Sequence, residues 1–171
     1  MIFLSIGSNL SSKFGNRFDN INNAIKFLIS NEVLPIKISN FFETPSYPNK
    51  KNPKFINVAL EVKFNQSPTL LLKKITYVEK KMQRLRAKRN EPRTCDIDII
   101  DFKKMKIDSA KIILPHPRAH SRNFVLYPMY EICPNWIHPL NNRKIDILIK
   151  NLTQTSRNEI TRLGKSAILD L

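Results

Sequence analysis

The apolar residues of this chain repeat with two different periods, and the order of these periods limits the fold more than any other feature. In some segments apolar residues form short runs or alternate with polar ones, as in strands, and in others they recur every three or four positions, as in helices. Strands are predicted over residues 2–8, 34–42, 55–64 and 96–102, and helices over 14–29 and 67–82. This order is the split βαβ arrangement, which predicts an α+β fold with both helices on one face of the sheet.

The remainder of the chain adds shorter elements to this unit. A proline-bearing loop over 114–118 precedes a short helix predicted over 122–132, and residues 145–152 again show helical spacing. Beyond Ser156 the sequence is polar, which predicts a loosely attached tail. Because no internal repeat and no low-complexity linker occurs, we expect a single domain over 1–155 and assign no role to the tail, 156–171.

The charge of the chain is strongly positive, with 29 basic against 14 acidic residues and a formal net charge of +15. Such a charge favours anionic partners. Lysine is spread along most of the chain, as a bias in codon usage would produce. Arginine is clustered instead, and Arg84, Arg86, Arg89 and Arg93 lie within ten residues. Since arginine suits forked recognition of phosphate, the informative part of the charge is local.

Two general features point to the cytoplasm. The two cysteines, Cys95 and Cys133, are too few for a disulfide framework and fit a reducing compartment. No apolar run approaches the roughly 20 residues that cross a bilayer, and the N-terminal strand lacks the basic segment of a signal peptide. We therefore expect a cytoplasmic protein with no membrane partner.

The strongest candidate for chemistry is the Asp-x-Asp pair at the start of the last predicted strand. Alternate side chains of a strand share a face, so Asp96 and Asp98 lie on one side and Cys95 and Ile97 on the other. Two neighbouring carboxylates with room for water and phosphate suit Mg²⁺. A solvated strand face paired with arginines is the alternative, and the arginine cluster beside the pair favours the metal and phosphate interpretation.

Two other segments carry weaker signals. His116 lies between two prolines on a rigid loop, from which it can donate a hydrogen bond to a phosphate or a ribose, whereas His120 is better explained as a surface residue. Arg122 and Phe124 begin a helix, whose N-terminus favours anions.

Phe55 and Asn57 share one strand face beside the loop that begins at Thr44, and an amide next to an aromatic ring suits the edge of a flat heterocycle. A core phenylalanine with an asparagine at the sheet edge explains the same pattern equally well. No phosphate-binding glycine loop, dinucleotide fingerprint, Cys/His metal cluster or serine nucleophile elbow occurs in the sequence.

Taken together, six ordered motifs resemble one enzyme family. They are Gly7-Ser8-Asn9-Leu10, Phe42-Glu43-Thr44-Pro45, Phe55-Ile56-Asn57, Arg84-Leu85-Arg86, the segment 92–98, and Pro115-His116-Pro117-Arg118 followed by 122–126. The chain resembles the 6-hydroxymethyl-7,8-dihydropterin pyrophosphokinases of folate biosynthesis, also called 2-amino-4-hydroxy-6-hydroxymethyldihydropteridine diphosphokinases, over about residues 1–139. The resemblance implies a ferredoxin-like βαββαβ sandwich with extra C-terminal elements.

The resemblance also implies the reaction, in which the β,γ-diphosphate of ATP is transferred to the pterin hydroxymethyl group and AMP is released. It assigns two Mg²⁺ ions to Asp96 and Asp98, and it makes these two residues, Arg84 and Arg93 catalytic. ATP binding is assigned to Arg84, Arg86, Arg93, His116 and Arg122. Pterin binding is assigned to Thr44, Pro45, Tyr47, Phe55, Asn57 and Phe124. Glu79 matches an acidic residue of the family whose role stays open.

The chain departs from the family pattern at the arginine-rich loop. Asn90 and Glu91 stand where the family usually has Trp-Gly in a mobile lid, and Gln83 replaces a usual glycine. We therefore expect an active enzyme with slower turnover.

Two alternative functions belong to other classes. A basic ferredoxin-like module can bind RNA through aromatic residues on its sheet, but the strand over 55–64 has no RNP1-like sequence. A metal-dependent nucleotidyltransferase would share the carboxylates but release pyrophosphate. We expect a monomer that binds ATP and the pterin and has no nucleic-acid partner.

Overall fold

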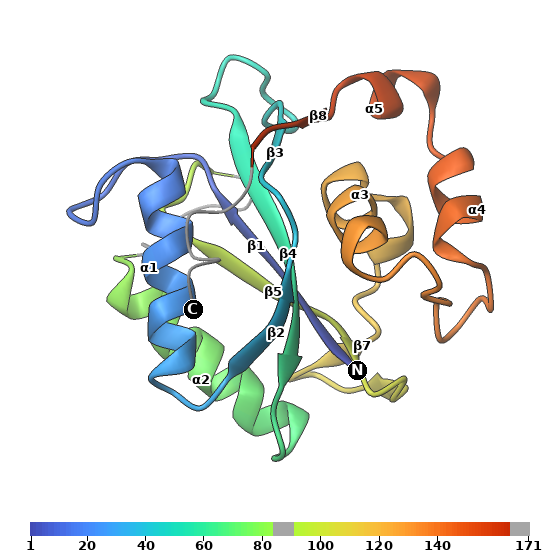
Figure 1. The fold of residues 1–171 in the computed structure, drawn as a ribbon, viewed down its shortest axis with the longest axis horizontal. Helices are drawn as coiled ribbons and strands as arrows, with labels where there is room; N and C mark the ends of the chain where they lie inside the picture. The colour runs from blue at the N-terminus through green and yellow to red at the C-terminus, as the bar shows by residue number, and fades with distance from the viewer. Residues whose placement is uncertain (84–90, 165–171) are drawn as a thin grey trace.

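The computed structural model describes residues 1–83 and 91–164, and its centre is one antiparallel sheet (Figure 1). The strands are β1 (Ile2–Ser8), β2 (Leu34–Ile38), β3 (Phe42–Thr44), β4 (Phe55–Lys63), β5 (Asp96–Phe102) and β8 (Thr161–Arg162). Their order is β5-β1-β4-β3-β8, and β2 also pairs with β4. The predicted α+β arrangement is confirmed, with β1 between β5 and β4.

Two helices cover one face of this sheet, as the apolar spacing predicts (Figure 1). They are α1 (Arg17–Ile29) and α2 (Pro68–Lys81). Asn16 caps α1 in a capping box with Asp19, so this helix begins three residues later than the apolar pattern alone indicates. Ser67 caps α2, at the start of the helix predicted over 67–82. The apolar stripes of both helices pack on the sheet in the larger of two buried clusters.

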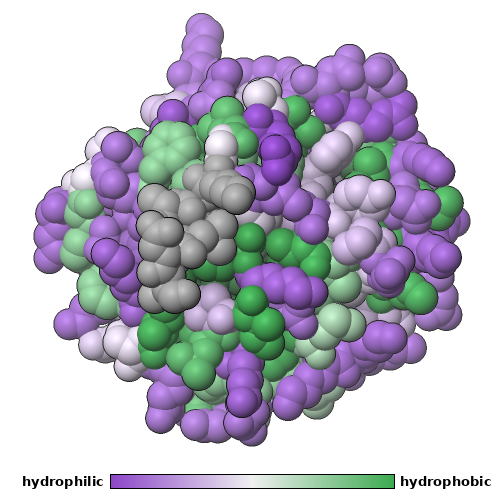
Figure 2. Space-filling model, in the orientation of Figure 1, coloured by the Kyte–Doolittle hydropathy of each residue, from purple (hydrophilic) through white to green (hydrophobic). Residues whose placement is uncertain are grey.

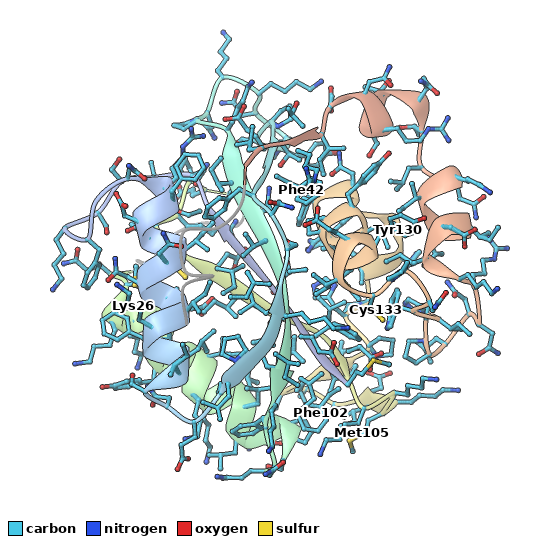
Figure 3. The ribbon with its side chains drawn as sticks, in the orientation of Figure 1. Lys26, Phe42, Phe102, Met105, Tyr130 and Cys133 are labelled. Carbon is cyan, nitrogen blue, oxygen red and sulfur yellow. The ribbon has the colours of Figure 1, made fainter. Side chains whose placement is uncertain are left out.

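The opposite face is covered by the C-terminal half of the chain. The elements there are η1 (Ala119–Ser121), α3 (Asn123–Ile132) and α4 (Ile145–Lys150), and a small hairpin of β6 (Ile107–Asp108) and β7 (Ile113–Leu114) precedes them. Phe3, Ala59 and Ile100 form a second buried cluster with α3 and α4. Figure 3 shows Phe42 and Cys133 in the layer between the sheet and α3, and Lys26 on the outer side of α1.

This second cluster corrects one expectation about β4. The alternation over 55–64 indicated a strand with one polar face, yet every residue from Ile56 to Val62 is buried. The reason is that α3 packs on the face that carries Asn57, Ala59 and Glu61. An alternating sequence does not reveal such a cover when it comes from a segment far along the chain.

Two further elements differ from the sequence prediction. The single strand expected over 34–42 is divided into β2 and β3, because Ser39 leaves the regular ladder and exchanges hydrogen bonds with Ala59 through its own backbone N–H and hydroxyl. The loose tail expected beyond Ser156 is wrong for the described residues. There the chain forms α5 (Gln154–Asn158) and then β8, which pairs with β3 at the sheet edge.

The surface drawn in Figure 2 is largely hydrophilic, in keeping with the basic composition. Among residues 1–83 and 91–164, no helix has the length and apolar character needed to span a membrane.

Candidate active site

A cleft of about 1130 Å³ opens on the α3 side of the sheet, beside the end of α3 that carries Asn123. Eleven of the thirteen residues predicted for the site line it: Thr44, Pro45, Tyr47, Phe55, Asn57, Arg93, Asp96, Asp98, His116, Arg122 and Phe124. The other two, Arg84 and Arg86, lie outside the described residues. Segments that are distant in the sequence therefore meet in one cleft.

The floor of the cleft is set by the register of three strands. Gly7 on β1 pairs with Asn57 on one side and with Asp96 on the other, and Ser5 pairs with Asp98. A Cβ atom at Gly7 would lie 3.1 Å from Asn57 Oδ1, closer than most real contacts. The two small residues of β1 thus leave open space between the carboxylates and the amide.

The carboxylates of Asp96 and Asp98 are partly exposed at 27% and 34%, and the intervening Ile97 is buried toward the opposite face. Arg93 NH1 lies 2.7 Å from Asp96 Oδ2, and Arg122 NH1 lies 3.5 Å from Asp98 Oδ2. Two carboxylates on one side of a rigid strand fit Mg²⁺, which takes its remaining ligands from water and phosphate. Within residues 1–83 and 91–164 no group of three metal-ligating side chains occurs, so a metal would depend on such outside ligands.

His116 is held in a single tautomer beside these carboxylates. Its Nδ1 accepts a hydrogen bond from Arg118 N at 3.1 Å, which leaves the proton of the neutral ring on Nε2. Nε2 lies 3.7 Å from Asp98 Oδ2. Burial, together with the charges of Arg122 and Arg118, lowers the His116 pKa to about 4. His116 is therefore a neutral hydrogen-bond donor at ordinary pH.

Two aromatic rings lie in the cleft, and an arginine guanidinium group lies near each of them. Arg93 Cζ is 6.0 Å from the Phe55 ring centre, and Arg122 Cζ is 5.3 Å from that of Phe124. Burial lowers the pKa of Arg122, an effect that the charge of Asp98 opposes. The same two arginines thus contact a carboxylate and an aromatic ring each.

The amide of Asn57 is oriented by its neighbours. Asn57 is buried, and its Nδ2 donates to Thr44 Oγ1 at 3.1 Å and to the Phe42 carbonyl at 3.4 Å. Its Oδ1 lies on the side of Gly7, at the floor of the cleft. Tyr47 is 83% exposed on the loop above.

Asn9, for which no site role was predicted, connects two walls of the cleft. Its Oδ1 accepts from Arg93 N at 2.7 Å, and its Nδ2 donates to Ser46 Oγ at 3.1 Å and to the Pro53 carbonyl at 3.0 Å. The only indication in the sequence was its place in the Gly7–Leu10 motif. A turn-forming asparagine in a motif does not predict hydrogen bonds to such distant partners.

Glu79, whose role the sequence leaves open, makes a structural contact. This buried residue of α2 accepts a hydrogen bond from Ile97 N at 2.9 Å. The contact fixes the backbone between Asp96 and Asp98. Close by, Thr94 Oγ1 donates to the Met82 carbonyl at 2.8 Å, which joins the segment before β5 to the end of α2.

Four more cleft residues come from the C-terminal part of the chain: Thr153, Thr155, Ser156 and Glu159. They were not predicted from the sequence, because a short polar segment carries no motif and no clear periodicity.

Comparison with known proteins identifies the family of this site. The model of the 7,8-dihydro-6-hydroxymethylpterin-pyrophosphokinase (HPPK) family matches residues 3–134, more than three quarters of the chain. This chain belongs to the HPPK family. The resemblance found in the sequence is thereby confirmed, and the chain is an enzyme, a pyrophosphokinase of folate biosynthesis.

Curated HPPK relatives match most of the chain. The 2-amino-4-hydroxy-6-hydroxymethyldihydropteridine pyrophosphokinase of Bacillus subtilis is 33% identical over 132 residues, which cover 77% of each protein. The enzyme of the same name from Aquifex aeolicus is 36% identical over 145 residues, covering 84% of this chain and 87% of the relative.

Solved HPPK structures share the fold. A crystal structure of HPPK-DHPS in complex with substrates superposes with a TM-score of 0.71 at 14% identity, covering 95% of this chain and 46% of that one. Plasmodium falciparum HPPK-DHPS gives a TM-score of 0.65 at 17% identity, covering 86% and 44%. This chain thus spans less than half the length of those proteins, and the likeness confirms the ferredoxin-like fold.

Proposed function

We propose that this pyrophosphokinase transfers the β,γ-diphosphate of Mg²⁺-bound ATP to the hydroxymethyl group of 6-hydroxymethyl-7,8-dihydropterin. The hydroxymethyl oxygen loses its proton and bonds to the β-phosphorus, the bond from that phosphorus to the α,β-bridging oxygen breaks, and AMP leaves. The observation that carries the proposal is the strand register. Ser5 and Gly7 of β1 lie between Asp96 and Asp98 on one side and Asn57 on the other, and all of these residues line a single cleft.

The described residues divide between the two substrates. The pterin ring would lie between Phe55 and Phe124, with its edge at the Asn57 amide and the backbone of Thr44 and Pro45. Tyr47 lies on the exposed loop beside this position and would cover the ring. Asn57 is held in orientation by Thr44, so little reorganisation is needed when the pterin binds.

The phosphates would lie near the carboxylates, where cationic and neutral donors surround them. Arg93 and Arg122 supply positive charge, and His116 donates from Nε2 without carrying a charge of its own. By resemblance Arg84 and Arg86 would bind the phosphates as well. In phosphoryl transfer such positioning and charge stabilisation supply most of the rate enhancement.

Asp96 and Asp98 would hold two Mg²⁺ ions, which would neutralise phosphate charge and orient the polyphosphate. The two carboxylates lie on one side of β5 and leave coordination positions for phosphate and water, as Mg²⁺ requires. Glu91 lines the same cleft with a negative charge, which supports the expectation of slower turnover.

The RNA-binding alternative is not favoured, because the sheet face that such a module exposes is covered by α3 around Ala59.

A nucleotidyltransferase differs from a pyrophosphokinase in its products. The decisive experiment is to incubate the protein with Mg-ATP and the pterin and to separate the nucleotides. AMP should form in step with pterin loss, whereas pyrophosphate or ADP as product would contradict the proposal. Addition of EDTA should abolish AMP formation.

We further propose a monomeric, cytoplasmic enzyme with no nucleic-acid or membrane partner. Both cysteines are buried free thiols, which supports a reducing compartment. Gel filtration at micromolar concentration would test the monomeric state.

A further inference from the structure

The segment 153–162, called the C-terminal arch below, lies beyond the part of the chain that the family model matches. It runs from the end of α4 past the start of α3 to the β3 edge of the sheet (Figure 1). Four of its residues line the cleft. These positions make the arch a wall of the cleft that the family motifs do not account for.

The first contact of the arch holds it to the wall that carries Phe124. Asn123 Nδ2 donates to the Ser156 carbonyl at 2.7 Å, and Asn123 Oδ1 accepts from Phe124 N at 2.7 Å. One amide side chain therefore links the arch to the backbone of the aromatic residue.

The second contact holds the arch to the opposite wall. The Glu159 carboxylate forms an ion pair with the Lys50 ammonium group, and both residues line the cleft. Lys50 lies on the loop between β3 and β4, five residues before Phe55. The arch thus connects the two segments that carry the aromatic rings.

The third contact fixes the far end of the arch. Its strand β8 pairs with β3, and Arg162 Nε donates to Glu131 Oε2 on α3 at 2.9 Å. Burial alone would raise the pKa of Glu131, but hydrogen bonds from Asn40 and Arg162 outweigh burial and lower it. With this end anchored to both the sheet and α3, movement of Glu159 relative to the cleft is restricted.

We propose that the C-terminal arch sets the separation between the Phe55 wall and the Phe124 wall, and that Glu159 is a positioning residue for pterin binding through Lys50. Loss of the Lys50–Glu159 pair frees the loop that leads to Phe55. The space between Phe55 and Phe124, called the aromatic slot here, must then be ordered when the pterin enters. This inference rests on the proposed function, since the pterin is the ligand whose fit depends on the slot.

The test compares Glu159→Gln, Lys50→Gln and the double variant in steady-state kinetics and in pterin binding with a non-hydrolysable ATP analogue. Each should weaken pterin binding and raise its KM roughly two- to fivefold, the size expected of a partly exposed ion pair. The KM for ATP and the unfolding midpoint should stay unchanged. The double variant should match the single ones, because all three remove the same contact.

A charge exchange and a control variant make the outcomes decisive. Lys50→Glu combined with Glu159→Lys should restore pterin affinity to within about twofold if the pair itself acts. Glu32→Gln removes a comparable exposed pair with Lys74 at 3.1 Å outside the cleft and should change nothing. Wild-type activity with unchanged pterin KM in every variant would overturn the inference alone. An inactive wild-type protein that binds no pterin would overturn the proposed function.

Discussion

Arg93 bridges a carboxylate and an aromatic ring of the cleft: its NH1 lies 2.7 Å from Asp96 Oδ2, and its Cζ lies 6.0 Å from the Phe55 ring centre. Its backbone is held as well, since Arg93 N donates to Asn9 Oδ1. A guanidinium in this place neutralises the carboxylate before any metal arrives. If Mg²⁺ bound at Asp96, as proposed, it would replace this guanidinium, which would then be available to a phosphate.

Arg93→Gln should therefore change metal affinity and turnover in opposite directions. Removing the competing cation should raise the affinity of nucleotide-free protein for Mg²⁺ roughly two- to fivefold, by the weak Coulomb energy of partly exposed charges. Turnover should fall about 100-fold, because a charge that stabilises the transition state is lost. Calorimetric metal titration and AMP release measure the two effects. Arg17→Gln, which removes one of the two basic partners of Glu43 outside the cleft, is the control. Weaker Mg²⁺ binding by Arg93→Gln would contradict the exchange.

Gly7→Ala should damage pterin binding more than stability. The added methyl carbon would lie 3.1 Å from Asn57 Oδ1 and 3.5 Å from Phe55 Cδ1, so the amide must shift by a few tenths of an ångström. We expect the pterin KM to rise about tenfold and the free energy of unfolding to fall by about 1 kcal/mol. Gly164→Ala is the control, because no atom lies within 4 Å of its added carbon. An unchanged pterin KM in Gly7→Ala would show that Asn57 does not read the ring edge.

His116 should titrate far below the range usual for histidine. Burial and the charges of Arg122 and Arg118 lower its pKa to about 4 in the folded protein, against about 6.5 for an unperturbed histidine. As pH falls from about 6.5 to 4 the unfolded chain takes up a proton that the folded one refuses, so stability contributed by neutral His116 is lost over this window.

NMR titration of the ligand-free protein measures this pKa directly. His116→Asn assigns the resonance and should also flatten the decline in unfolding free energy between pH 6.5 and 5. The variant must be compared with the wild type because burial lowers the pKa of His138 as well, so both histidines contribute to the pH dependence. An inflection of the His116 signal near pH 6.5 would show that burial and the two arginines do not lower its pKa.

Sequence patterns predicted those parts of the fold whose cause is local. Ser67 caps α2 at the start of the helix predicted over 67–82, and the apolar periods mark β1, β5 and both sheet-covering helices within a few residues. Likewise, strand alternation alone places Asp96 and Asp98 on one side of β5. These features depend on neighbours a few positions away, and the sequence contains that information.

The remaining features depend on contacts between distant segments. The polar face expected on β4 is buried because α3, nearly 70 residues later, packs on Ala59. Glu159 reaches the cleft because β8 pairs with β3, a pairing of two residues that leaves no apolar pattern. Asn9 belongs to the same group, with its partners at Arg93 and Pro53. Such contacts follow from topology and are not visible in local periodicity.

Gln83 marks a departure from the family that the structure explains in conformational terms. It directly follows Met82, the C-cap of α2, and its φ of 59° lies in the left-handed region. Glycine is the usual residue at this position of a helix end, because it has no Cβ to crowd the backbone. The family glycine that the sequence lacks is therefore the residue that this turn favours.

Gln83→Gly should raise the free energy of unfolding by roughly 0.5–1 kcal/mol. The left-handed conformation costs a residue with a side chain about 1–2 kcal/mol, and the greater freedom of glycine in the unfolded chain offsets part of the gain. Urea titration should show a higher midpoint with an unchanged slope. Gln66→Gly provides the matched control, since Gln66 is exposed and has no positive φ, and it should be neutral or slightly destabilising. The two glutamines differ in that only Gln83 has a positive φ. Equal changes of the urea midpoint in both variants would therefore mean that this φ imposes no conformational cost.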